Sequence, residues 1–195
     1  MGAKELYFLR HGDTGLHGRY IGSTDVPLAV VGVEQVRKTG RILQDKGISQ
    51  IFCSPLLRCR QTLQILDLPW PCQFSDLLKE IDFGQWEGKT FAEIAHSDQG
   101  LVDSWLSDPD SFSFPGGESL HSFKDRVARF KIQLENMAEE TALVITHGGV
   151  IRHILCMLLG LESARYLLFD ASPGCFCSIR LFAEGGVLTG FNISG

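Results

Sequence analysis

Two apolar stretches of strand length, far apart in the chain, each end in a histidine followed by glycine. Leu6–Leu9 leads into Arg10-His11-Gly12, and Ala142–Thr146 leads into His147-Gly148-Gly149. A short, continuously apolar run is typical of a strand buried on both faces of a parallel sheet. One such pair could be a surface feature after a core strand, but two are hard to explain by packing. Because ligands in open α/β sheets bind beyond the carboxyl ends of the strands, we expect both histidines in one site.

The rest of the chain alternates between the two kinds of periodicity. Apolar spacing predicts helices over 28–46, 56–66, 91–96, 101–106, 120–137 and 150–159. Short apolar runs predict strands over 48–53 and 72–74 and a hairpin over 176–191. This order predicts an α/β fold, a three-layer sandwich with helices on both faces of a mainly parallel sheet. With 195 residues and no internal repeat or linker, we expect a single domain over residues 1–195.

Two serines are predicted to begin helices. Ser54, followed by Pro55, has the residue types of an N-cap and a first helical position, and Ser119 is the expected cap of the long helix. The helix after Ser54 carries Arg58 and Arg60 in its first two turns, where the helix dipole disfavours cations. The pair indicates either a nearby anion or carboxylate partners. We interpret Arg60 as a surface residue.

The composition argues against several classes of partner. A formal net charge of −5 makes general affinity for nucleic acid or anionic membranes unexpected. No apolar run reaches the roughly 18 residues of a membrane span, and the first strand leaves no room for a signal peptide. The six cysteines fit no zinc spacing and are expected to be buried free thiols. We therefore expect a cytoplasmic protein.

Five side chains that follow strands or begin a helix form a plausible phosphoryl-transfer set: Arg10, His11, Arg58, Glu80 and His147. Arginine forks match the oxygens of a phosphate. A neutral imidazole can act as a nucleophile, and a carboxylic acid can protonate a leaving oxygen.

In this combination the chain resembles the histidine phosphatase superfamily, the phosphoglycerate mutase-like proteins. Five elements match in the family's order: 9–14, 53–62, 78–88, 115–119 and 146–152. The resemblance spans nearly the whole chain. A lone Arg-His-Gly is a weak signal because tripeptides recur by chance, whereas the five elements together are specific.

The resemblance implies a role for each residue of the set. His11 would take the phosphoryl group as a phosphohistidine, and Arg10, Arg58 and His147 would hold the phosphate oxygens. Glu80 would protonate the leaving alcohol and then activate water, although Asp82 and Glu87 lie close enough in sequence to remain alternatives. No metal and no cofactor are implied, because the cationic side chains would stabilise the phosphate charge.

The resemblance also points to residues that would contact the substrate: Gly12, Thr14, His17, Ser23, Thr24 and Gly148. The N–H of Gly148 would add a helix-terminal contact to an anion. The family often has an asparagine six residues after the nucleophile, where this chain has His17. We interpret Arg152 and His153, one turn further along the helix, as structural.

The expected activity is hydrolysis of a small-molecule phosphate monoester. The segment between Glu80 and His147 lacks the longer insert of true phosphoglycerate mutases. The segments 18–28, 82–88 and 115–119 look most like those of α-ribazole-5'-phosphate phosphatases, which act in cobalamin biosynthesis. The alternatives are a sugar-phosphate phosphatase, such as a fructose-2,6-bisphosphatase-like or broad-specificity enzyme, a phosphoglycerate mutase, and a non-catalytic module that binds a phosphometabolite.

Overall fold

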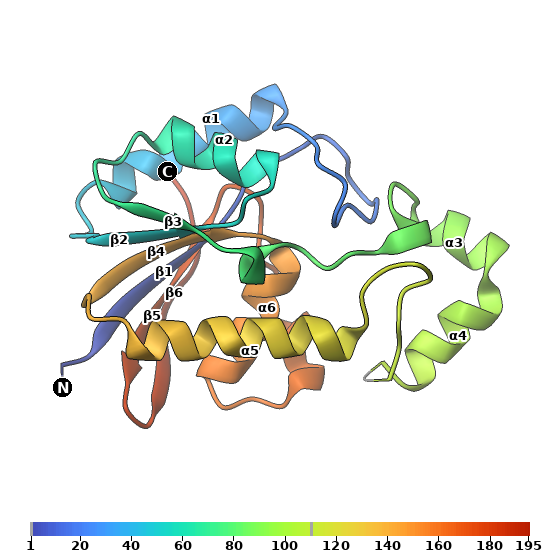
Figure 1. Ribbon diagram of the computed structural model, residues 1–195. Helices are drawn as coiled ribbons and strands as arrows, with labels where there is room; N and C mark the ends of the chain where they lie inside the picture. The colour runs from blue at the N-terminus through green and yellow to red at the C-terminus, as the bar shows by residue number, and fades with distance from the viewer. Residues whose placement is uncertain (1, 110) are drawn as a thin grey trace.

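The computed structural model describes residues 2–109 and 111–195, which form a six-stranded sheet with helices on both faces (Figure 1). The strands are β1 (Lys4–Arg10), β2 (Gln50–Cys53), β3 (Cys72–Phe74), β4 (Thr141–Thr146), β5 (Phe176–Phe182) and β6 (Gly185–Ile193). They lie in the order β3-β2-β4-β1-β5-β6. The first four of these are mutually parallel, and β5 and β6 add an antiparallel hairpin at one edge. The predicted α/β sandwich is confirmed.

The helices form the outer layers. One face of the sheet carries α1 (Val30–Leu43) and α2 (Leu57–Leu66), and the other carries α5 (Leu120–Asn136) and α6 (Gly148–Leu158) (Figure 1). Two shorter helices, α3 (Phe91–Ser97) and α4 (Gln99–Ser107), lie beyond the carboxyl ends of the parallel strands, to the right in Figure 1. Three short 3₁₀ turns complete the described elements: η1 (Asp76–Leu78), η2 (Gly84–Trp86) and η3 (Ser163–Leu168).

Strand β1 separates two cores by its alternating side chains. Leu6 and Phe8 pack with the inner faces of α5 and α6, whereas Tyr7 and Leu9 pack with α1 and α2. All four side chains are buried, as the continuous apolar run predicts. Because β1 lies inside the sheet between β4 and β5, its carboxyl end is fixed at the centre of the molecule.

Of the two predicted helix caps, the structure confirms one and contradicts the other. Ser54 does not cap α2: the N-cap is Leu56, and the Ser54 hydroxyl instead lies 2.8 Å from His147 Nε2. Ser54 continues the edge of β2, because its N–H bonds the carbonyl of Ile145, so a tertiary contact overrides the capping preference. The cap at Ser119 is confirmed by a bond from the N–H of Ser122.

Helix α1 begins at Val30, two residues later than the spacing predicted, and its first turn lies against the loop after β1. A Cβ atom on Gly32 would lie 2.1 Å from the carbonyl oxygen of Asp13, so only glycine allows this approach. The N–H of Ala29, the N-cap of α1, bonds that same carbonyl. The contact ties the start of α1 to the segment that follows His11.

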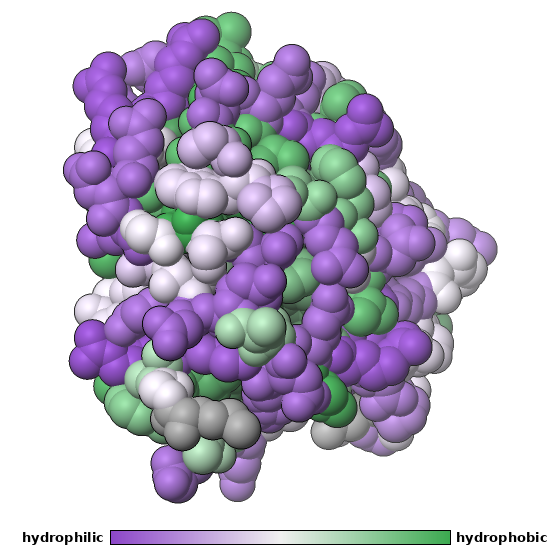
Figure 2. Space-filling model, turned by 60° about the vertical axis from the view of Figure 1, so that its left-hand side comes forward, coloured by the Kyte–Doolittle hydropathy of each residue, from purple (hydrophilic) through white to green (hydrophobic). Residues whose placement is uncertain are grey.

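The surface and the cysteines agree with the composition. On the face in Figure 2, hydrophilic residues predominate and hydrophobic ones are scattered among them. Within the described residues, no helix combines the length and apolar character needed to cross a membrane. The six cysteines are free, and all except Cys72 and Cys175 are buried.

Candidate active site

The imidazole of His11 is buried at the carboxyl end of β1. Its Nδ1 lies 2.8 Å from the carbonyl oxygen of Gly12. Since a carbonyl can only accept, Nδ1 carries the proton, and in the neutral ring the lone pair is therefore on Nε2. Burial lowers the pKa of His11 well below 6.5, and the charges of Arg10 and Arg58 lower it further. The ring is thus held neutral with a nucleophilic Nε2.

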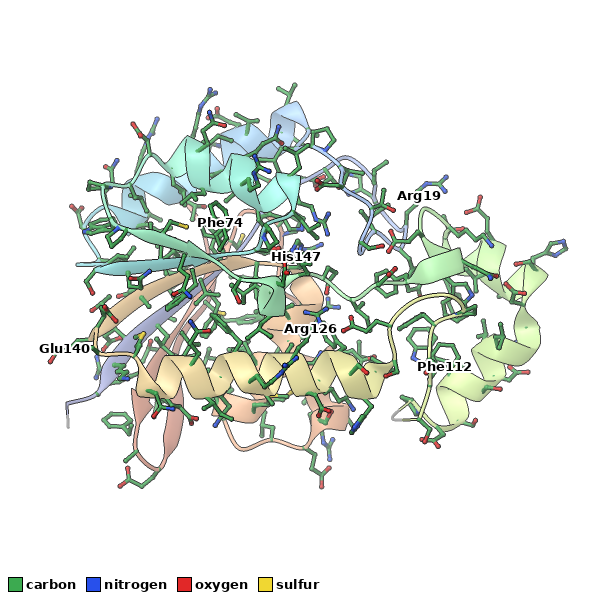
Figure 3. The ribbon with its side chains drawn as sticks, in the orientation of Figure 1. Arg19, Phe74, Phe112, Arg126, Glu140 and His147 are labelled. Carbon is green, nitrogen blue, oxygen red and sulfur yellow. The ribbon has the colours of Figure 1, made fainter. Side chains whose placement is uncertain are left out.

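The second imidazole, His147, is the N-cap residue of α6 and lies at the centre of the molecule (Figure 3). Its ring centroid is 5.1 Å from that of His11. Arg58 Nε donates to His147 Nδ1 over 3.2 Å, so Nε2 carries the proton and donates to the Ser54 hydroxyl. Burial and the charge of Arg58 lower the pKa of His147 well below its ordinary value. Both rings are therefore neutral, in opposite tautomers.

The two predicted phosphate-binding arginines differ in how fully their N–H donors are hydrogen-bonded. The buried fork of Arg58 bonds the carbonyl oxygens of Thr24, at 3.0 Å, and Gly22, at 2.7 Å. Arg10 donates through Nη1 to the carbonyl of Ala171. Its Nε is buried and has no hydrogen-bond partner within residues 2–109 and 111–195. An unpaired buried donor is costly, so Arg10 is the cation best prepared to bind an anion.

Glu80 lies where α6 begins. Its Oε2 accepts a bond from the N–H of Gly149 at 2.9 Å, and its Oε1 accepts from the N–H of Ile81. A Cβ atom on Gly149 would lie 2.4 Å from Glu80 Oε1, so the glycine provides the room for this carboxylate. The N–H of Gly149 thus already meets an anionic group, and the contact predicted for the N–H of Gly148 stays a prediction.

The two other candidate acids accept hydrogen bonds that stabilise loops. Glu87 accepts bonds from the N–H groups of Gly22, Ser23, Thr24 and Phe83. Asp82 accepts from the Ser23 hydroxyl and the N–H of Gly84. These carboxylates shape the loop over the site, which leaves Glu80 as the acid that faces a cavity.

That cavity has a volume of about 340 Å³ and lies against the amino end of α6. One part of its wall consists of Arg10, Glu80, Gly148 and Gly149. The rest is largely aromatic: Tyr20, Phe83, Trp105, Phe114, Phe123 and Tyr166. The arrangement places a cation and a carboxylate at one end of a pocket suited to a flat, apolar group.

Several predicted contact residues lie outside this pocket. The described lining includes none of Thr14, His17, Ser23 and Thr24. The His17 side chain is 75% exposed and lies 3.7 Å from the Asp13 carboxylate. Gly12 packs against the backbone of Gly32, and Gly148 lies against the Arg10 guanidinium. Direct substrate contact by these residues stays a prediction.

Three cationic or potentially cationic side chains line the pocket although they were not among the predicted site residues: Arg19, Arg152 and His153. Arg152 and His153 were expected to be structural. They follow Gly148 and Gly149 by four residues, a spacing that repeats one helix face and could have placed them beside the site. The His153 ring stacks on Tyr166 at 4.6 Å between centroids. Arg19 and Trp105 come from separate segments, and no sequence spacing links them.

Among the described residues, no group of three or more histidine, cysteine or acidic side chains is arranged to hold a metal ion. The described lining contains a guanidinium and a carboxylate, from Arg10 and Glu80, whereas His11, Arg58 and His147 are buried and are not among the lining residues. His11 and His147 each adjoin a lining residue in the sequence, Arg10 and Gly148. Guanidinium, carboxylate and neutral imidazole are together suited to binding an anion, attacking it with a ring nitrogen and moving one proton.

Comparisons with known proteins agree with this chemistry. A family model described as histidine phosphatase superfamily (branch 1) matches residues 6–194. The adenosylcobalamin/alpha-ribazole phosphatase of Escherichia coli is 28% identical over 90% of this chain and 89% of its own. Phosphoserine phosphatase 1 of Hydrogenobacter thermophilus is 27% identical over 97% and 92%. The crystal structure of the alpha-ribazole phosphatase of Shigella flexneri superposes with a TM-score of 0.88 at 27% identity, covering 97% of this chain and 96% of that one.

Proposed function

Since this chain belongs to the histidine phosphatase superfamily, we propose that it hydrolyses a small phosphate monoester through a phosphohistidine on His11. The proposed physiological substrate is α-ribazole 5'-phosphate. The observation that carries the proposal is the composition of the cavity, where Arg10 and Glu80 lie at one end of an aromatic pocket.

In the first step, the lone pair of His11 Nε2 attacks phosphorus while the bond from phosphorus to the ester oxygen breaks. The bond from Nδ1 to Gly12 fixes the tautomer that makes this attack possible. Arg10 Nε supplies an uncommitted donor to a phosphate oxygen. Glu80, in its acid form, gives its proton to the leaving oxygen, so the alcohol departs neutral.

In the second step, water attacks the phosphohistidine and the bond between nitrogen and phosphorus breaks. Glu80, now a carboxylate, takes the proton from water, and inorganic phosphate and a neutral His11 remain. The bond from Gly149 N–H to Glu80 Oε2 keeps the carboxylate oriented through both steps. Arg58 and His147 hold the loop at residues 22–24 and the Ser54 edge. The guanidinium of Arg58 adds positive charge near the phosphate, and the neutral ring of His147 adds an N–H donor.

The aromatic wall supports α-ribazole 5'-phosphate because this ester carries an aromatic base on its ribose. Trp105 and Tyr166 both line the pocket and come from different elements, one from α4 and one from η3. Stacking of a base on an aromatic side chain contributes about 1–3 kcal/mol, enough to select one leaving group among many. A phosphate ester without a ring would leave these faces unused.

The test is a panel of esters compared by kcat/KM: α-ribazole 5'-phosphate, phosphoserine, fructose 2,6-bisphosphate and p-nitrophenyl phosphate. We expect α-ribazole 5'-phosphate to exceed phosphoserine by about tenfold or more. Trp105→Ala should remove most of that preference, whereas Leu106→Ala, at an adjacent residue that is 65% exposed, should keep it. A preference for fructose 2,6-bisphosphate, or mutase activity without hydrolysis, would contradict the substrate assignment.

Phosphoserine is the second candidate substrate. The similarity to phosphoserine phosphatase 1 favours it, and so does the presence of Arg152 in the pocket lining. The Arg152 guanidinium bonds the Phe169 carbonyl and lies 3.8 Å from the Asp170 carboxylate, so a substrate carboxylate would join or replace these partners. Under this alternative, Arg152→Gln would reduce kcat/KM for phosphoserine far more than for p-nitrophenyl phosphate. A non-catalytic binding module would show no turnover with any ester of the panel.

A further inference from the structure

An ion pair outside the pocket holds the segment that carries Glu80. Arg126, on α5, meets Glu118 with two parallel bonds, from Nε to Oε1 at 2.7 Å and from Nη2 to Oε2 at 2.8 Å. The two side chains are 11% and 18% exposed. Neither belongs to the described lining of the pocket. A mostly buried bidentate pair of this kind is rigid and specific for arginine.

The remaining donors of Arg126 all bond the backbone next to Glu80. Nη1 donates to the carbonyl oxygens of Leu77, at 3.0 Å, and Lys79, at 2.6 Å, and Nη2 donates to that of Glu80 at 3.0 Å. Figure 3 shows where this side chain leaves α5. A guanidinium has five N–H donors, and these bonds with the Glu118 pair use all five. Arg126 therefore has no donor left for a substrate, and its whole bonding capacity serves this segment.

Glu118 holds the same segment from its other side. Its N–H donates to the carbonyl of Asp82 at 2.9 Å, and its carboxylate accepts from the N–H of Asp82. The turn before it is pressed onto the loop, because a Cβ atom on Gly117 would lie 2.4 Å from the Asp82 carbonyl oxygen. The backbone on both sides of Glu80, within residues 77–82, is thus fixed by hydrogen bonds to Arg126 and Glu118. Within the part of the chain that the structure describes, the Glu80 carboxylate accepts its hydrogen bonds from the N–H groups of Ile81 and Gly149.

We propose that Glu118 and Arg126 are positioning residues that fix Glu80 for proton transfer to the leaving group. The inference rests on the proposed acid–base role of Glu80. Proton donation works only within hydrogen-bond reach of the leaving oxygen, so a small displacement of the segment is enough to impair it. The ion pair explains why residues 115–119, the Pro-Gly-Gly-Glu-Ser element that contains Glu118, belong with the site although they lie far from Glu80 in the sequence.

The test uses Glu118→Gln and Arg126→Lys, which keep most of the packing. Arg129→Lys is the matched control, since Arg129 lies exposed on the same helix. Two esters separate the roles: an alkyl ester such as ribose 5-phosphate needs a protonated leaving oxygen, whereas p-nitrophenolate leaves as a stable anion. We expect a 10- to 100-fold lower kcat for the alkyl ester in both variants, with KM little changed. The single-turnover rate of phosphohistidine formation from p-nitrophenyl phosphate should change less than about threefold.

A double-mutant comparison with Glu80→Gln identifies the residue through which the pair acts. In the Glu80→Gln background, Arg126→Lys should cause no further loss on the alkyl ester. Equal losses on both esters, additive losses in the double variant, or failure of both single variants to fold would overturn the inference, because each marks a general structural role. If Glu80→Gln itself shows no selective loss on the alkyl ester, the proposed function of Glu80 fails, whatever the pair does.

Discussion

At the scale of single residues, the chemistry of the site depends on which ring nitrogen carries the proton in His11 and in His147. His11 has its proton on Nδ1 because of the Gly12 carbonyl, and His147 has its proton on Nε2 because Arg58 donates to Nδ1. Positive charge and burial lower the pKa of both rings. A neutral His11 is what nucleophilic attack requires.

His11→Ala is expected to lower kcat by at least about 10³-fold, because no other group in the site would replace the nucleophile. The fold should be retained, because the helices and strands do not depend on the His11 side chain. The far-ultraviolet circular dichroism spectrum of the variant should therefore match that of the wild type. Acid quenching destroys phosphohistidine, so the wild-type enzyme should be quenched in base, where it should show phosphate bound to protein. Appreciable turnover or bound phosphate in the variant would refute the assignment of His11.

At the scale of elements, the start of α6 brings the acid and the cation together. Gly148 lies against the Arg10 guanidinium, and Gly149 donates to Glu80. Arg152 and His153 on the next turn continue the same helix face into the pocket. One helix end thus orders a cation, a carboxylate and part of the leaving-group wall.

Gly149→Ala should lower activity without lowering stability. Alanine stabilises a helix by up to about 1 kcal/mol relative to glycine, so the thermal unfolding temperature should not fall. The new Cβ atom would lie 2.4 Å from Glu80 Oε1, and the flexible carboxylate would move away. We expect a loss of about 10²-fold in kcat on an alkyl phosphate. Gly100→Ala in α4, where a Cβ atom meets nothing within 4 Å, is the control and should keep full activity.

At the scale of the whole molecule, the carboxyl edge of the sheet positions His11, the proposed nucleophile, and the segments beyond that edge supply much of the pocket wall. Trp86 is fully buried beneath these segments and packs edge-on to Trp105 and Phe114. This aromatic cluster joins the loop after Glu80 to α4. Under the proposed function, the substrate preference would be set by these segments, which contribute none of the proposed reacting groups.

Stability should fall in acid because of the buried imidazoles of His11 and His147. Their pKa values are lowered in the folded state, so the unfolded chain binds the extra protons first, near pH 6.5. Stability is therefore complete above about pH 6.5 and is lost as the pH falls towards the folded values, at up to about 1.4 kcal/mol per pH unit for each ring. Urea unfolding at pH 7 and pH 5 should show a smaller difference in His11→Gln than in the wild type. His121→Gln, at a histidine that is 77% exposed, should match the wild type.

Turnover should be unchanged by EDTA, because the proposed mechanism places the phosphate charge on Arg10, Arg58 and the α6 end. The measurement is kcat with and without prolonged chelation, followed by addition of single divalent ions. Loss of activity that one ion restores would require a different mechanism.

Local patterns in the sequence determined most of the helices and strands and indicated the candidate reacting groups. The apolar runs before His11 and His147 specified two buried strands, and parallel strands bring their carboxyl ends to one edge. Helical spacing also predicted the long α5, whose cap at Ser119 is observed. Such patterns are readable because each depends only on neighbours a few residues away.

The tertiary structure alone decided which polar groups are committed and which remain available. Ser54 has the residue type of a cap, but it bonds His147, and Glu87 has that of an acid, but it holds the 22–24 loop. Arg126 bonds the backbone of residues that lie 46 to 49 positions away in the sequence. No spacing encodes these choices, because a polar side chain can bond many groups and only the packed backbone determines which one lies within reach.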